Sequence, residues 1–426
     1  MIFQQDSNLT RKTKQAFHPG AYYAEKAVAA LFFAVICFMA LHSFAYPFDF
    51  VRYEVSDWLI NYQGGFVRRG LVGELLLTLE KIFPYNVKHA ILGIETISYI
   101  LFFAVTFRIF MKYGWSLLAA MFPVACVTMS LGCYRDFMML CLCALTYYIF
   151  FKYLKEKRKP LLVFSVAVMS LNVIVYEPVF FVLVPILALQ YWYACGERKT
   201  LKTALVFIIP TSCMLLSCIY RGNGAQADTI WQSWMPYMKA DGYDPADGMG
   251  YAVEFLKLTN TEVFKIHLES SFGDNVPSSI ITLFIVITFA FFLCTYIPQT
   301  DGNNKTLACN KHKSELGWIL LFQLLIQLPL FTVLSTDYGR TLPMSLYTSF
   351  FLFHYSTVNG ININVTRPLR AASDKIISLF DRIPLFSNPY FYILAVLVFP
   401  FQMFMPSLWR DNIVMHLYDK IIKYIL

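Results

Sequence analysis

The chain has 426 residues, of which 58% are hydrophobic and only 15% are charged, and its mean hydropathy is +0.53. Soluble domains carry roughly 25% charged residues, so these values exclude an ordinary soluble enzyme or binding domain. The net charge of +8 does not indicate a nucleic-acid-binding protein, because the basic residues flank apolar runs and do not form one patch.

Apolar runs of about 16–22 residues recur along the chain, and each is long enough, or nearly long enough, to cross a bilayer. We therefore predict an all-α, polytopic integral membrane protein with about 11 transmembrane helices in a single transmembrane domain, residues 1–426. The predicted helices lie near 27–46, 91–111, 115–133, 137–154, 161–176, 179–195, 203–220, 278–298, 317–335, 341–357 and 390–408.

Basic residues concentrate in alternate connecting segments, such as KYLKEKRK and GERKTLK. The positive-inside rule then places the N-terminus in the cytoplasm and, for an odd number of spans, the C-terminus in the periplasm. We expect a bacterial inner membrane protein with two long periplasmic loops, 47–90 and 221–277.

In the first loop, the leucine spacing of LVGELLLTLEKIF predicts a helix in the plane of the interface. In the second, the aromatic residues of TIWQSWMPYM predict contact with lipid headgroups.

Ionisable residues that are unusual for a membrane protein all fall on the predicted periplasmic side. They are Asp57, Arg68, Arg69, Arg135, Glu177, Arg221, Asp337 and Arg340. Charges near the headgroup boundary cost free energy and usually face a cavity or one another, so we expect these side chains to converge. The five arginines are predicted phosphate binders, because a planar guanidinium makes two parallel hydrogen bonds to phosphate.

The stretch QGGFVRRG adds two glycines beside the arginine pair. Gly64 and Gly65 would let backbone N–H groups approach the same anion. The carboxylates of Asp57, Glu177 and Asp337 are, in that order, the candidate catalytic bases that would deprotonate a sugar hydroxyl.

Each of these motifs also has a structural interpretation. Arg68 and Arg69 would then bind lipid headgroups or neutralise Glu74. Glu177 would cap the helix that follows Pro178, because an acidic residue and a proline both suit a helix N-terminus.

Cofactor signatures are absent from the sequence. It contains no Walker loop, no dinucleotide fingerprint and no HExxH or Cys/His ligand spacing, so we expect no cofactor and no metal.

The segments DWLINYQGGFVRRGLVGELL, VYEPVF and TDYGRT, together with the layout of spans and one large outer loop, resemble bacterial O-antigen or capsule repeat-unit polymerases of the Wzy type. The resemblance implies a glycosyltransferase of lipopolysaccharide or polysaccharide biosynthesis. Such an enzyme transfers a polyprenyl-diphosphate-linked glycan, such as one on undecaprenyl diphosphate, onto a lipid-linked repeat unit at the periplasmic face. The partners it implies are that glycan, membrane lipids and a chain-length regulator protein, with no nucleic acid.

The layout is also similar to that of GT-C glycosyltransferases, which use a polyprenyl-phosphate sugar donor. In that group an aspartate of the first loop commonly acts as the base, which corresponds here to Asp57. The alternative from another class is a flippase for lipid-linked oligosaccharides. A transporter should show paired halves and charges near the middle of the membrane, whereas these charges crowd one surface.

Overall fold

The computed structural model describes residues 50–112, 135–195, 198–272, 305–327, 338–364 and 366–383, together with Ala27. Every regular element in these ranges is a helix, as predicted. Three helical segments in them are long and apolar enough to cross a membrane: Val87–Ile109, Asp136–Glu156 and Lys199–Ile219. The predicted spans 27–46, 115–133, 278–298 and 390–408 lie outside the described residues except for Ala27, so the count of about 11 spans stays a prediction.

The other predicted spans overlap helices of the described chain, although the end of 317–335 lies outside the described residues. These helices are α5 (Val87–Lys112), α7 (Asp136–Glu156), α8 (Lys159–Val175), α9 (Val179–Ala194), α10 (Lys199–Ile219), α15 (Lys305–Ile326) and α16 (Tyr338–Asn359). The 16 residues of α9 make a helix of about 24 Å, which is shorter than the roughly 30 Å of a bilayer core.

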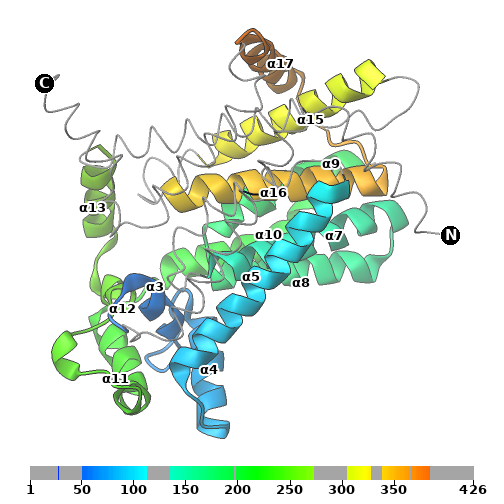
Figure 1. Ribbon diagram of the computed structural model, residues 1–426. Helices are drawn as coiled ribbons and strands as arrows, with labels where there is room; N and C mark the ends of the chain where they lie inside the picture. The colour runs from blue at the N-terminus through cyan, green and yellow to red at the C-terminus, as the bar shows by residue number, and fades with distance from the viewer. Residues whose placement is uncertain are drawn as a thin grey trace, which may run out of the picture.

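Helices α7 to α10 run alternately in opposite directions through a bundle (Figure 1). Asn172, near the end of α8, donates from Nδ2 to the carbonyl oxygen of Met139, near the start of α7, at 3.2 Å. The start of α7 and the end of α8 therefore share one end of the bundle, and a short turn at 176–178 starts α9 there as well. The basic segments 152–159 and 198–202 consequently lie at the opposite end.

Helix α16 runs parallel to α7. In its first half, the ring of Tyr347 lies 4.7 Å from that of Phe102, which in turn lies 5.4 Å from the ring of Phe137 at the start of α7. Near its end, Tyr355 packs 5.7 Å from Tyr148, in the second half of α7. α16 therefore begins at the same end of the bundle as α7.

The two predicted periplasmic loops fold into helices, most of which pack against one another at this end (Figure 1). The first contributes α3 (Tyr53–Ser56), η1 (Asp57–Leu59) and α4 (Gly70–Ile82); the second contributes α11 (Gly224–Ala240), η2 (Pro245–Asp247), α12 (Tyr251–Glu254), η3 (Phe255–Lys257) and α13 (Asn260–Phe272). Trp234 of α11 donates from Nε1 to the carbonyl oxygen of Leu59 at 2.7 Å, which joins the two loops directly.

The prediction that the aromatic residues of the second loop contact lipid headgroups is wrong for its two tryptophans. Trp231 is 3% exposed and Trp234 is 0% exposed. A Cβ atom on Gly250 would lie 2.8 Å from the ring of Trp231, so the backbone before α12 approaches this ring closely. Both indoles are used to pack the second loop against the first.

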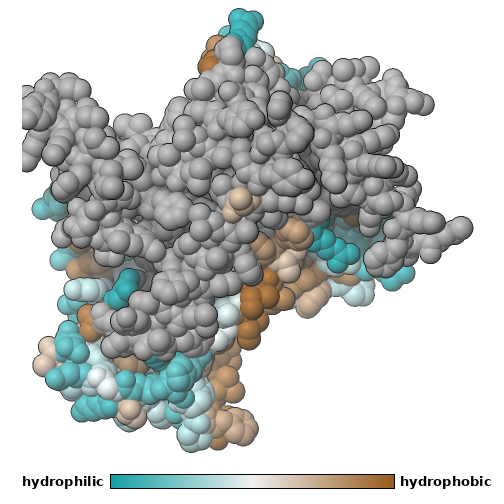
Figure 2. Space-filling model, in the orientation of Figure 1, coloured by the Kyte–Doolittle hydropathy of each residue, from teal (hydrophilic) through white to brown (hydrophobic). Residues whose placement is uncertain are grey.

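Helix α4 is the helix predicted from the leucine spacing. Leu76 and Leu77 are buried, whereas Leu75, Leu79 and Ile82 are exposed. A helix with this exposed apolar face suits the plane of a membrane interface. In Figure 2, hydrophilic residues gather over the end that carries α11, and hydrophobic residues lie along α5.

At the opposite end, α17 (Arg367–Asp381) lies against α15. Ser314 of α15 donates to Oδ1 of Asp374 at 2.6 Å. Ile376 and Leu379 are exposed on a helix that also carries Arg367 and Arg370, so α17 is amphipathic.

Candidate functional site

Arg69 lies at the centre of a charged cluster where the first loop meets the end of the helical bundle. It precedes the first residue of α4 in the left-handed conformation, with φ 62° and ψ 5°. This conformation costs a residue with a side chain roughly 1–2 kcal/mol, so the surrounding packing must hold it. The next residue has to be Gly70, because a Cβ atom there would clash with the ring of Tyr62.

Glu177 receives both arms of the Arg69 guanidinium. Arg69 donates from Nε to Oε2 and from Nη2 to Oε1, each at 2.8 Å. Glu177 lies in the short turn between α8 and α9 and is 8% exposed. The pair is thus a buried, two-bond Arg–carboxylate contact between residues that are 108 positions apart.

Arg135 and Asp57 form the second half of the cluster. Arg135 is 1% exposed and donates from its two terminal nitrogens to the carbonyl oxygens of Asp57 and Arg69. Its Nε lies 3.3 Å from Oδ2 of Asp57, an ion pair without hydrogen-bond geometry. Oδ1 of Asp57 accepts from Nη1 of Arg69 at 3.4 Å, so the carboxylate of Asp57 bridges the two arginines.

Three aromatic side chains that the sequence did not single out complete the cluster. The guanidinium carbon of Arg69 lies 4.5 Å from the centroid of the Tyr176 ring, and Nη1 of Arg69 donates to the hydroxyl of Tyr53 at 3.4 Å. The guanidinium of Arg135 lies 5.4 Å from the ring of Trp58. Tyr176 and Trp58 adjoin the candidate acids in the sequence, and that adjacency is the signal that would have found them.

Arg68 and Arg221 lie at the outer edge of the cluster. Nη1 of Arg68 lies 3.3 Å from Oε1 of Glu177, and its side chain is 21% exposed, twice the 10% of Arg69. The backbone N–H of Arg68 donates to the carbonyl oxygen of Tyr220 at 2.8 Å, which brings Arg221 to the same edge. Among the three arginines that form ion pairs in the cluster, Arg68 has the most exposed side chain.

Burial and charge act in opposite directions on these groups. Burial alone would raise the pKa of Glu177, but the positive charges of Arg69 and Arg68 outweigh it and lower that pKa to about 2. Burial and, to a smaller extent, the like charge of Arg68 lower the pKa of Arg221 to about 10, although Glu177 opposes the shift. Burial also lowers the pKa of Arg135, against the effect of Asp57.

The structure gives Gly64 and Gly65 a packing role. A Cβ atom on Gly64 would lie 2.9 Å from Cα of Gln226 in α11, and Gly65 has a φ of 103°. The glycines therefore let the first loop turn tightly against the second.

The structure does not support the interpretations that Arg69 neutralises Glu74 or that Glu177 caps the helix after Pro178. Glu74 accepts from the backbone N–H of Tyr62 at 2.9 Å and from Gln63 at 2.8 Å, so these groups hold Glu74, while Arg69 pairs with Glu177. Glu177 does not cap α9, whose N-cap is Pro178, without a side-chain cap.

The remaining candidates come from the segment TDYGRT. Asp337 lies outside the described residues, and Arg340 lies in the first turn of α16, where the structure describes its backbone. Since α16 begins at the same end of the bundle as α7, the backbone of Arg340 lies at the end that carries the cluster.

The cluster has more positive than negative charge. Four arginines of the described chain, Arg68, Arg69, Arg135 and Arg221, lie around two carboxylates, those of Asp57 and Glu177. An anionic group at the Arg68 edge would offset this excess and the mutual repulsion of Arg68 and Arg221.

Comparison of the chain with protein-family models, with curated proteins and with solved structures gave no match.

Proposed function

We propose that this chain is a glycosyltransferase of the bacterial inner membrane that polymerises lipid-linked glycan repeat units. It would transfer a polyprenyl-diphosphate-linked glycan onto a new lipid-linked repeat unit at the periplasmic face. The observation that carries the proposal is the excess of arginine in the cluster, at an end of an apolar helical bundle where two loops and two helix turns meet.

The phosphate enters at the Arg68 edge. Arg68 and Arg221 bind the diphosphate of the donor and stabilise the charge that grows on it as the bond to the sugar breaks. Arg69 and Arg135 each bond to several protein groups and are not the first contacts of the phosphate. They position the carboxylates of Glu177 and Asp57.

In the reaction, the acceptor hydroxyl attacks the anomeric carbon, a carboxylate takes the hydroxyl proton and polyprenyl diphosphate leaves. Asp57 is the first candidate for this base. Glu177, with a pKa of about 2, is a weak base while Arg69 and Arg68 hold it. A phosphate that draws Arg68 away would raise that pKa towards the usual range.

A GT-C glycosyltransferase with a polyprenyl-phosphate sugar donor is the second candidate function. It is favoured by the position of Asp57, which lies in η1 and precedes α4 in the first loop. The exposed Leu75, Leu79 and Ile82 of α4 suit a helix that lies at the membrane interface. The two functions share the catalytic chemistry and differ in the donor.

The test is elongation of a purified lipid-linked repeat unit by the full chain in detergent, followed as a ladder of glycan lengths. We expect the substitution Arg68→Lys to slow elongation about 100-fold, because lysine cannot make two parallel bonds to phosphate. The matched control is Arg158→Lys, at an exposed arginine at the other end of the bundle, which should leave the rate unchanged.

Two outcomes would contradict the proposal. One is full-length polymer from Arg68→Lys at the wild-type rate, which removes the phosphate-binding role. The other is a wild-type chain that does not lengthen the repeat unit but carries it across a vesicle membrane, which identifies a transporter.

A further inference from the structure

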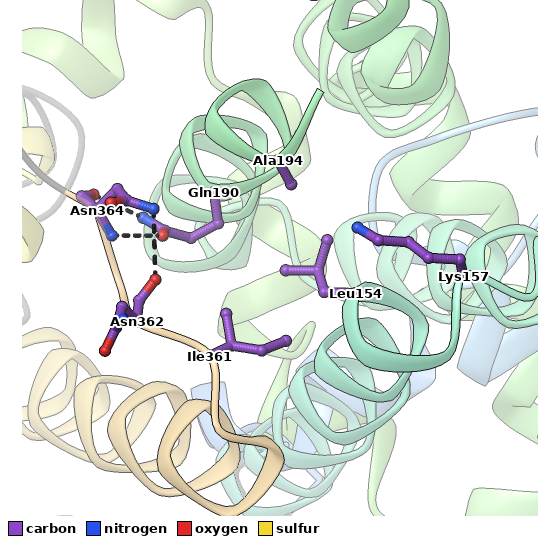
Figure 3. Close-up of a pocket in the computed structure, with 7 residues that line it drawn as sticks. All are labelled: Leu154, Lys157, Gln190, Ala194, Ile361, Asn362 and Asn364. Atoms are coloured by element: carbon purple, nitrogen blue, oxygen red, sulfur yellow. Dashed lines mark hydrogen bonds between the residues drawn. The ribbon is translucent and has the colours of Figure 1, made fainter. Parts of the chain in front are cut away.

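A cavity lies at the other end of the bundle, where α7 and α9 end and the segment after α16 passes beside them. Its volume is about 320 Å³, and Figure 3 shows the side chains around it. Ligand pockets in proteins measure roughly 300–1,000 Å³, so the cavity has room for a group the size of a lipid headgroup.

Gln190 fixes one wall of the cavity. Its amide donates from Nε2 to the carbonyl oxygen of Asn364 at 3.0 Å and accepts from the backbone N–H of Asn364 at 2.9 Å. Both polar ends of this 3% exposed side chain are used for the backbone of one residue. The segment after α16 is thereby held in place, with the side chains of Asn362 and Asn364 on the cavity wall (Figure 3).

Lys157 supplies a positive charge to the opposite wall. It follows the last residue of α7 in the left-handed conformation, with φ 59°, a position where glycine is more usual. Its backbone N–H donates to the carbonyl oxygen of Tyr153 at 2.7 Å. In Figure 3 its ammonium end extends towards Leu154, across the cavity from Asn364.

The surroundings of the cavity are strongly basic. Segments 152–159 and 198–202 contain eight basic residues and one acidic residue. Lys199 lies 5.1 Å from the ring of Trp192, and lysines and tryptophans together are typical of the headgroup level of a membrane. The charge indicates an anionic ligand, and Leu154 and Ile361 in the lining indicate that this ligand has an apolar part.

We propose that this cavity binds the headgroup of an anionic phospholipid from the leaflet that meets this end of the bundle. The phosphate lies between Lys157 and the side-chain amide of Asn364, whose Nδ2 also donates to the carbonyl oxygen of Asn362 at 3.4 Å. The glycerol portion rests on Leu154 and Ile361. The amphipathic helix α17, with exposed Ile376 and Leu379, lies at the same end and contacts the same leaflet.

The test measures lipid retained by the purified full chain after transfer from nanodiscs of phosphatidylglycerol or of phosphatidylcholine into detergent, counted by native mass spectrometry. We expect wild type to retain phosphatidylglycerol in preference to phosphatidylcholine. Lys157→Ala should retain about tenfold less phosphatidylglycerol, the effect of losing one charge-assisted hydrogen bond. The matched control Lys159→Ala removes the same charge two residues away and should retain lipid like wild type.

A second variant tests the cavity without changing the charge. Ala194→Trp places a large side chain against the cavity and should also lose the retained phosphatidylglycerol. Lys157, Lys159 and Ala194 are all exposed, so these substitutions leave the fold intact. Equal loss from Lys157→Ala and Lys159→Ala, equal retention of the two lipids by wild type, or unchanged retention by Ala194→Trp would each overturn the proposal.

Discussion

At the residue scale, the cluster shows how one strained backbone position organises several charges. Arg69 adopts a left-handed conformation, and its guanidinium then reaches Glu177, Asp57 and the hydroxyl of Tyr53. Removing one partner from such a buried network is costly, because the other is left as an uncompensated charge. The two adjacent arginines therefore differ in role: Arg69 binds the buried carboxylates of Glu177 and Asp57, whereas Arg68 lies at the more exposed edge of the cluster.

This network predicts a defined pH dependence of stability. The pKa of Glu177 is about 2 when folded and 4.5 ordinarily, so ionised Glu177 stabilises the fold above about pH 4.5, and this stabilisation is lost as pH falls through about 2. We expect the stability advantage of wild type over Glu177→Gln to reach at most about 3 kcal/mol near neutral pH and to shrink as the pH falls below about 4.5. Thermal unfolding of both proteins in detergent across this range measures it; an advantage that does not change with pH would contradict the prediction.

At the scale of elements, the contact between α4 and η1 depends on glycine. A Cβ atom on Gly73 would lie 2.8 Å from the carbonyl oxygen of Trp58 and would clash with that of Ile60. The helix thus approaches the backbone of η1 as closely as atoms allow. This contact holds α4 close to η1, and Arg69 and Asp57 lie on these two neighbouring elements.

Gly73→Ala should therefore separate α4 from η1. We expect the free energy of unfolding to fall by about 1–3 kcal/mol, the usual cost of overpacking. The control is Gly93→Ala in α5, where a Cβ atom has no other atom within 4 Å; there, stability should rise by up to about 1 kcal/mol, because alanine is the better helix former. Equal effects of the two substitutions in chemical denaturation would show that close packing does not hold α4.

At the scale of the whole molecule, the two ends of the bundle differ in character. One end carries the Arg–carboxylate cluster under the packed loops, and the other carries the basic segments, the cavity beside Lys157 and α17. In a membrane, this asymmetry favours placing the basic end in the cytoplasm.

Cysteine labelling tests that orientation. In a background without native cysteines, Gln63→Cys near the cluster should react with a membrane-impermeant maleimide in intact spheroplasts. Lys159→Cys at the basic end should react only after permeabilisation. Both positions are exposed, so accessibility from one side is the only difference expected. Labelling of both from the same side would exclude the predicted topology and, with it, a periplasmic site.

Much of the architecture could be predicted from the sequence, because span length, leucine spacing and the placement of basic residues are local properties of the chain. They determined that the described chain is helical, that α4 forms, and that Asp57, Arg69, Arg135 and Glu177 share one end of the bundle. The partners of each charge were decided only by the tertiary structure. Arg69 pairs with Glu177, 108 positions away in the sequence. Trp234 donates to the carbonyl oxygen of Leu59 instead of facing lipid headgroups. Such contacts depend on how distant segments fold against each other, which local sequence patterns do not specify.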